Sequence, residues 1–279
     1  MMKWTLDEFK YELEADPKRK VLFVEGSSDQ VLWNKLVPSE SRNHSMICTS
    51  DYIDIEVIFG GNRARLLKLA EECVGSCIEG RVRIFIDSDY DSISGYSSYS
   101  NIVSRTDYRD MESYYIVMNG IDDVCSVYGL NKEDVRACYV RMLKPLYSLR
   151  YTSIVSGLHL PINDTISEKF GKYVLGKNIK EYSINLDKII TSSLQNANIS
   201  ISKKHTVLEE VNKVLSSIED KEVPFVIHGK DLVGFISHLT RDSFEVSSKS
   251  ILLFLLAKVD DLRAMPNVSN LVSWVEEST

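Results

Sequence analysis

The sequence predicts an α/β fold in which a mostly parallel sheet flanked by helices is followed by a mainly helical C-terminal domain. Two mainly apolar runs, at residues 21–24 and, with Arg83 as its one charged residue, at 82–86, each end at a carboxylate. Strands buried on both faces of a parallel sheet have this continuous apolar character. From about residue 131 the alternation of strands and helices stops and helical spacing prevails. We therefore expect an α/β domain at residues 1–125 and a helical domain at residues 126–279.

Capping and turn signals place the elements of the first half. A Thr5-x-x-Glu8 capping box starts the first helix, and Gly26 followed by Ser27-x-x-Gln30 starts the second. The expected elements are a helix at 4–15, a strand at 21–24, a helix at 28–37, a polar loop at 39–51, a strand at 53–59, a helix at 63–79, a strand at 82–86, a loop at 88–104 with a short strand at 102–103, and a helix from 106 or 107 to 118.

The second half has helical spacing almost throughout. We expect helices at 131–149, with a kink near Pro145, and at 186–196, 206–218, 248–262 and 268–277, with one possible strand at 224–227. We assign this half to assembly and regulation.

Composition is that of an ordinary soluble globular protein: 279 residues, 44% hydrophobic and 26% charged. The longest apolar run, residues 251–257, is far shorter than the roughly 20 residues that span a membrane. The first residues carry no signal-peptide pattern, and the five cysteines form no Cys-x-x-Cys pair. We expect a cytoplasmic protein with reduced thiols and no membrane association.

The formal net charge of −7 argues against nucleic-acid binding by electrostatics alone. A metal site changes this argument, because divalent ions can bridge carboxylates and phosphate.

Acidic side chains stand where the two apolar strands end. Glu25 follows the first strand, and Asp87 and Asp89 follow the second. Ligands of open α/β sheets bind beyond the carboxyl ends of the strands, so we expect these three carboxylates at one edge. Hard oxygen ligands suit Mg²⁺ or Mn²⁺. Asp29 and Asp91 are weaker candidates, since Asp29 also suits the start of a helix.

Three further segments have both a functional and a structural interpretation. Asp110 and Glu112 stand near an expected helix start, where acids also complement the helix dipole. His228 and Lys230 follow an apolar run and could reach the same edge, with Lys230 steadying a phosphate as a catalytic cation. Lys230 could equally be a surface lysine that starts a helix.

The Val-Glu-Gly of residues 24–26 and the Ile-Asp-Ser-Asp of residues 86–89 resemble the motifs of the TOPRIM domain, the Mg²⁺-binding module of topoisomerases, primases and several nucleases. The second acid at Asp29 is similar to that of the overcoming-lysogenization-defect nucleases. The segments at 106–114 and 228–233 resemble TOPRIM-like proteins encoded beside ABC-type ATPases, in particular the nuclease subunits of phage anti-restriction-induced systems (PARIS).

This resemblance implies an Mg²⁺- or Mn²⁺-dependent endonuclease with Glu25 as principal ligand or metal-positioned base, and with Asp29, Asp87, Asp89 and Glu112 as further ligands. It also implies a toxin of antiviral defence by abortive infection. An ABC-type ATPase would hold the protein, which would act as a homodimer once freed and cut host tRNA rather than DNA.

Two other functions fit part of the pattern. A haloacid-dehalogenase-type phosphatase could use Asp87 as nucleophile and Asp89 as acid, but it would leave Glu25 without a role. A non-catalytic interaction module could use the acidic edge only to bind basic groups of a partner.

Overall fold

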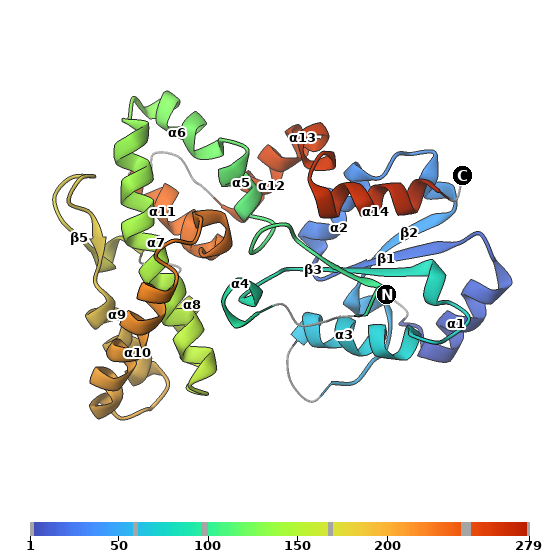
Figure 1. The fold of residues 1–279 in the computed structure, drawn as a ribbon, viewed down its shortest axis with the longest axis horizontal. Helices are drawn as coiled ribbons and strands as arrows, with labels where there is room; N and C mark the ends of the chain where they lie inside the picture. Colours follow the sequence, from blue (N-terminus) through green and yellow to red (C-terminus); the bar gives the residue numbers. More distant parts are fainter. Residues whose placement is uncertain (1–2, 58–60, 96–99, 167–169, 241–246, 278–279) are drawn as a thin grey trace. The chain divides into compact units, whose positions relative to one another are not determined.

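The computed structural model describes residues 3–57, 61–95, 100–166, 170–240 and 247–277, which pack as two compact units. The first unit consists of Met1–Ser88, Gly95–Met111 and Leu255–Thr279. The second consists of Asp89–Ser94 and Glu112–Phe254. The sheet belongs to the first unit, and the second is mainly helical (Figure 1).

The first unit is built on a four-stranded sheet in which every neighbouring pair is parallel. The strands are β1 (Lys20–Val24), β2 (Ser45–Thr49), β3 (Val82–Ile86) and β4 (Val103–Arg105), in the order β2-β1-β3-β4. Val24 at the end of β1 pairs with Thr49 of β2 and with Phe85 of β3. The carboxyl ends of the two central strands therefore lie side by side.

Helices α1 (Leu6–Ala15) and α3 (Gly61–Cys73) cover one face of this sheet (Figure 1). Phe9 and Leu13 of α1 and Leu66 of α3 join the inward residues of β1 and β3 in one buried apolar cluster. The rings of Phe9 and Phe23 meet edge to face with centroids 5.5 Å apart. The Thr5–Glu8 capping box is formed as expected and fixes the start of α1.

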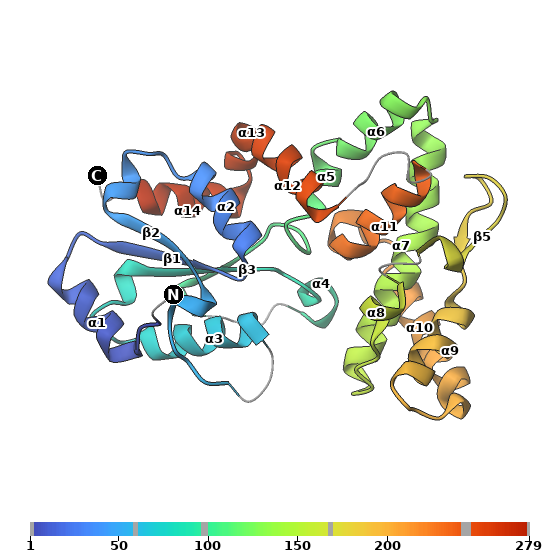
Figure 2. The ribbon, with the colours of Figure 1, turned by 180° about the vertical axis from the view of Figure 1, so that it is seen from behind.

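Helices α2 (Ser27–Leu36) and α14 (Pro266–Glu276) cover the opposite face, as the view from behind also shows (Figure 2). Trp33 of α2 packs edge to face on Phe85 of β3, with ring centroids 5.0 Å apart. The ring of Trp274 on α14 lies under the ammonium group of Lys20, 4.8 Å away, and under the guanidinium of Arg83, 5.1 Å away. The short helix α13 (Val259–Arg263) precedes α14 and packs beside α2.

The second unit is organised around the long helix α7 (Lys132–Val155). The side chain of Asn131, the residue before this helix, caps its first turn. Its other elements are α4 (Asp91–Ser94), α5 (Ser113–Val117), α6 (Gly120–Tyr128), α8 (Ile162–Ile166), β5 (Val174–Leu175), β6 (Ser183–Ile184), α9 (Leu186–Asn196), α10 (Lys204–Ser217) and α11 (Gly229–Leu239). Helix α12 (Ser248–Ala257) leads from this unit back to the first. Among the described residues no helix is long and apolar enough to cross a membrane.

One strand of the sheet was not predicted, and two predicted strands are wrong. The second strand of the sheet is Ser45–Thr49, inside the segment expected to be a polar loop, because Ile47 and Cys48 are buried beside β1. Of the predicted strand at 53–59, residues 58 and 59 lie outside the described part, and residues 53–57 form only one bridge, from Ile53 to Trp4. The segment expected as a strand at 224–227 contains a 3₁₀ turn instead, at Val223–Phe225.

Two predicted helices are shorter than expected. Helix α3 ends at Cys73 rather than residue 79, and Gly75 follows with a φ of +73°. The helix expected from residue 106 or 107 begins at Ser113. The hydroxyl of Thr106, expected as its cap, instead accepts a hydrogen bond from the Ser88 amide at 2.9 Å and donates to the Tyr108 carbonyl at 2.6 Å. Thr106 thus ties the end of β3 to the end of β4.

The two units differ from the expected division at residue 125. The chain passes from the first unit to the second within the Asp87-Ser88-Asp89 motif, and Leu255–Thr279 returns to the first unit. The return has a physical cause in the buried apolar stripe of α14, formed by Val268, Leu271, Val272 and Val275.

Candidate functional site

The carboxyl edge of the sheet brings Glu25 and Asp87 together. Glu25 is the first residue after β1, and Asp87 is the first after β3, the strand that pairs with it. The Asp87 amide donates a hydrogen bond to Glu25 Oε1 at 2.9 Å. The contact joins two neighbouring strand ends and leaves both carboxylate-bearing residues at the edge where ligands of parallel sheets bind.

Arg63 and Asn62, at the start of α3, complete this edge. One guanidinium nitrogen of Arg63 donates to the Asp87 carbonyl and lies 3.9 Å from Glu25 Oε1. The side-chain amide of Asn62 donates to the backbone carbonyl of Glu25 at 2.8 Å. Gly61 has a φ of +62°, a left-handed backbone that glycine adopts without steric cost. A cation therefore stands beside the central carboxylate.

Asp29 adds a second acid in the first turn of α2. Its carboxylate accepts a hydrogen bond from the Gly26 amide at 2.9 Å. Burial, together with the nearby charge of Asp110, raises the pKa of Asp29 from 3.8 to about 6, although the Gly26 hydrogen bond acts in the opposite direction. Asp110 is itself buried and forms an ion pair with Arg109. The raised pKa of Asp29 therefore results mainly from burial, with the like charge of Asp110 as a second cause.

In the second unit, Glu112 lies against the start of α11. A Cβ atom on Gly229 would come within 2.7 Å of the Glu112 side chain, so only glycine permits this approach. His228 caps α11 by accepting a hydrogen bond from the Lys230 amide at Nδ1, 3.1 Å away. Glu112 and the 228–230 segment, far apart in the sequence, therefore meet. Lys230 is exposed, and it also lines a small cavity beside Asp231.

Asp89 and Asp91 also belong to the second unit. Asp89 has a φ of +48°, and its carbonyl accepts a hydrogen bond from the Tyr147 hydroxyl at 3.4 Å. Asp91 is buried at the first position of α4. Tyr90, between them, packs its ring on those of Tyr147 and Tyr151, with centroids 5.2 Å and 5.5 Å away. The segment after the Asp-x-Asp motif is thus fixed on α7.

The described residues contain no group of three or more His, Cys, Asp or Glu side chains arranged to hold a metal ion. The five predicted ligands are divided between the units: Glu25, Asp29 and Asp87 in the first, Asp89 and Glu112 in the second. Mg²⁺ nonetheless binds through one or two carboxylates while waters and substrate phosphate supply its other ligands. The oxygen groups of Glu25 and Asp87 fit that chemistry.

The sequence alone did not indicate that Arg63 lies beside both strand ends. The available signal was the glycine pair at residues 60 and 61 directly before a helix. A helix that follows the sheet edge starts at that edge, so its first side chains reach the strand ends. Gly60 lies outside the described residues.

Comparison with known proteins adds no family: no protein-family model matches the chain, and no curated protein matches it significantly. The functional argument therefore rests on the residues at the sheet edge.

Proposed function

We propose that the protein is a metal-dependent nuclease of the TOPRIM-like type. The observation that supports this most directly is the contact between Glu25 and Asp87 at the ends of two paired parallel strands. Glu25 and Asp87 would hold Mg²⁺ or Mn²⁺. Asp29, Asp89 and Glu112 are the further ligands that the sequence resemblance implies. The bound ion would polarise a phosphodiester and supply an activated water.

The chain's own groups have distinct tasks in this proposal. Glu25 would take up a proton from the attacking water, and the Asp87 amide that donates to its carboxylate holds it in place. Arg63 stands close enough to balance charge on a phosphate bound at the edge. Lys230, at the start of α11, is the further catalytic cation that the sequence suggests.

The biological setting follows from the sequence resemblance rather than from the site. We propose a cytoplasmic toxin of an antiviral defence system, held by an ABC-type ATPase and released to cut tRNA, with a homodimer as the active form. The phosphatase alternative is less well supported, because it would leave the Glu25–Asp87 contact without a purpose.

The decisive experiment compares the parent with Glu25→Gln and Asp87→Asn on tRNA, plasmid DNA and a small phosphate ester. Each assay is run with Mg²⁺, Mn²⁺ or a chelator, with the protein alone and with its ATPase. Glutamine keeps an oxygen that can accept the Asp87 hydrogen bond, so the fold should survive while cleavage falls to background.

Glu72→Gln is the matched control, since Glu72 lies in the last turn of α3 and pairs with Lys68. It should cut like the parent. Cleavage by Glu25→Gln at the parent rate would refute the nuclease mechanism. Hydrolysis of the small ester alone would favour the phosphatase, and inactivity of the parent on every substrate would favour the interaction module.

A further inference from the structure

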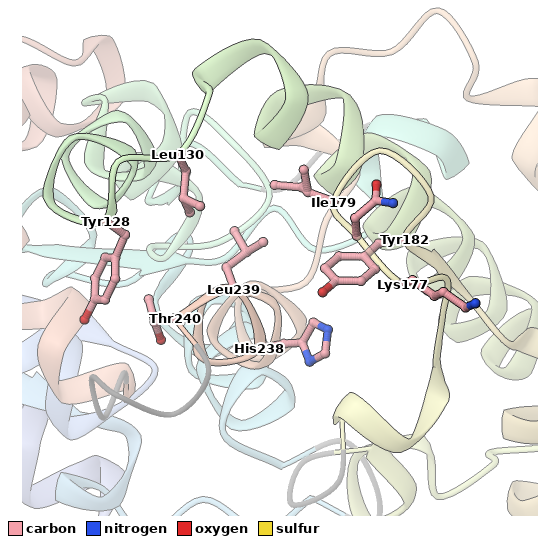
Figure 3. Close-up of a pocket in the computed structure, with 9 residues that line it drawn as sticks. Tyr128, Leu130, Lys177, Ile179, Tyr182, His238, Leu239 and Thr240 are labelled. Atoms are coloured by element: carbon pink, nitrogen blue, oxygen red, sulfur yellow. The ribbon is translucent and has the colours of Figure 1, made fainter.

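The second unit contains a pocket of about 480 Å³, distant in sequence from the acidic motifs. This volume lies within the range of small-molecule sites. Figure 3 shows Tyr182 and His238 beside one another, Tyr128 on the other side of Leu239, and Lys177 pointing away from the rest. The side chains that matter for recognition are those of Tyr128, Lys177, Tyr182, His238, Leu239 and Thr240.

One wall of the pocket is built in advance. The guanidinium of Arg141 on α7 donates to three carbonyls of the loop between β5 and β6, those of Ile179 (2.9 Å), Lys180 (3.0 Å) and Tyr182 (3.3 Å). Glu181 accepts from the Lys177 amide at 3.0 Å. Such fixed contacts lower the entropy cost of binding.

The aromatic groups are also held. The rings of Tyr182 and His238 lie with centroids 5.1 Å apart at an angle of 60°. The imidazole of His238 packs over Gly171, where an added Cβ would come within 3.2 Å of Nδ1. Leu239 supplies an apolar surface beside them, and the Tyr128 hydroxyl can donate or accept a hydrogen bond. The Thr240 hydroxyl donates to the Ser237 carbonyl at 3.1 Å and can still accept one. A planar, hydrogen-bonding ring matches this lining.

The charge of the lining is unusual for an acidic chain. The nine described residues that line the pocket include Lys177 and no carboxylate. The nearby Glu181 carboxylate is engaged by the Lys177 amide and by the Asn178 side chain at 2.7 Å. Lys180, on the same loop, pairs with Asp134 at 3.5 Å, so the positive charge of the lining comes from Lys177. The mouth of the pocket therefore favours an anionic group on the ligand.

We propose that this pocket binds a nucleotide, with its base against Tyr182 and His238 and its phosphate directed outward, at the edge of the pocket where Lys177 lies. Aromatic stacking combined with a neighbouring cation is the usual means of binding bases of single strands. The bound nucleotide is either a free mononucleotide or one residue of an RNA strand. Binding in this pocket needs no metal ion, so it can be measured independently of the proposed cleavage reaction.

The test measures binding to the full-length protein in a chelator, where metal-dependent cleavage cannot occur. Isothermal titration calorimetry is performed with the four ribonucleoside 5′-monophosphates and with a short mixed-sequence RNA. Tyr182→Ala should weaken binding about tenfold, the scale of one lost stacking contact. Lys177→Gln should weaken it about threefold and flatten its salt dependence. Tyr182→Phe should bind like the parent.

Two substitutions serve as matched controls: Lys203→Gln at another exposed lysine of the same unit, and Tyr11→Ala at a tyrosine that is 73% exposed on α1. Binding of monophosphates supports a free-nucleotide site, and binding of the RNA alone supports a strand subsite. Absence of binding by both probes overturns the proposal, as does parent-like binding by Tyr182→Ala and Lys177→Gln. Neither result bears on cleavage at Glu25, which is measured separately.

Discussion

At the scale of single residues, the Glu25 carboxylate lies beside an N–H donor and a cation. The Asp87 amide donates to it, and the Arg63 guanidinium lies 3.9 Å away. An opposite charge and a hydrogen bond to the charged form both favour an ionised carboxylate. Arg63 thus supplies, in this structure, part of the positive charge that a metal ion would supply.

We predict that Arg63→Gln binds Mn²⁺ more tightly than the parent, by about 2-fold to 10-fold, because removing one partly exposed ion pair changes the free energy by roughly 1 kcal/mol. Cleavage should nevertheless become slower, because the cation beside the phosphate is lost. Titration of metal binding by calorimetry separates the two effects.

Arg65→Gln is the control for Arg63, since Arg65 is on the same helix but pairs with Asp51 at 2.9 Å. It should leave Mn²⁺ affinity unchanged. Equal affinities for the parent and Arg63→Gln would show that the guanidinium does not compete with the ion. Loss of binding in Glu25→Gln would, in the same experiment, locate the metal.

The raised pKa of Asp29 predicts how the free energy of unfolding depends on pH. Its pKa is about 6 in the folded protein and 3.8 ordinarily, so the folded state binds this proton more tightly than the unfolded state. Stability is therefore lost as the pH rises from about 4 to 6. We expect Asp29→Asn, which keeps an acceptor for the Gly26 amide, to remove this loss and to be about 3 kcal/mol more stable than the parent at pH 7.

Chemical denaturation of parent and Asp29→Asn at a series of pH values measures this difference. The two proteins should have similar stability near pH 4 and diverge toward pH 7. Curves that stay parallel across this range would contradict the raised pKa.

At the scale of elements, the sequence predicted those that carry a strong signal. The two mainly apolar runs became β1 and β3, and the capping box became the start of α1. Strand β2 was missed because its pattern is short and mixed, and only its position beside β1 buries Ile47 and Cys48. Register and burial by a neighbour are tertiary effects, which local spacing does not contain.

The candidate site follows the same rule. Glu25 and Asp87 could be placed at one edge from the sequence, since each follows a recognisable strand. The meeting of Glu112 with Gly229 could not, because it depends on how two distant loops pack.

Helices α7 and α11 of the second unit are joined by a buried ion pair. Arg150 donates to both oxygens of Asp231, at 2.7 Å and 2.6 Å, and to Asn163 at 2.7 Å. We predict that Asp231→Asn lowers the free energy of unfolding by about 3–5 kcal/mol, because it leaves a buried guanidinium without its counter-charge. Arg150→Met with Asp231→Leu should recover most of this loss.

The exposed pair of Arg136 and Asp122, 2.7 Å apart in the same unit, is the control. Arg136→Gln should cost less than about 1 kcal/mol. Denaturant unfolding measures all four proteins. A cost for Asp231→Asn no larger than that of Arg136→Gln would show that the buried pair does not hold the two helices.

At the scale of the whole molecule, the sheet unit is assembled from three separate stretches of the chain. Its last stretch is held to the rest of the unit by polar contacts as well as apolar ones. Arg263 donates to the Leu36 carbonyl at 2.8 Å, and the Asn267 amide donates to Asp107 at 3.0 Å. A division of the sequence by composition assigns this stretch to the helical half, because a helix pattern does not state which surface buries it.

We predict that ending the chain after Phe254 unfolds the sheet unit and spares the helical core of the second. Deletion removes the apolar stripe of α14, whose four buried side chains contribute roughly 6–12 kcal/mol. That is comparable with the whole stability of a domain, about 5–15 kcal/mol.

Hydrogen exchange should show loss of protection in β1 and β3 and retained protection in α7. Protected β1 and β3 in the truncated chain would contradict the prediction. Leu271→Ala in the full chain is the milder comparison, with an expected cost of about 2–5 kcal/mol. Binding of the proposed ATPase is therefore better tested by surface substitutions than by C-terminal deletion, since a deletion would also unfold the sheet that carries the candidate site.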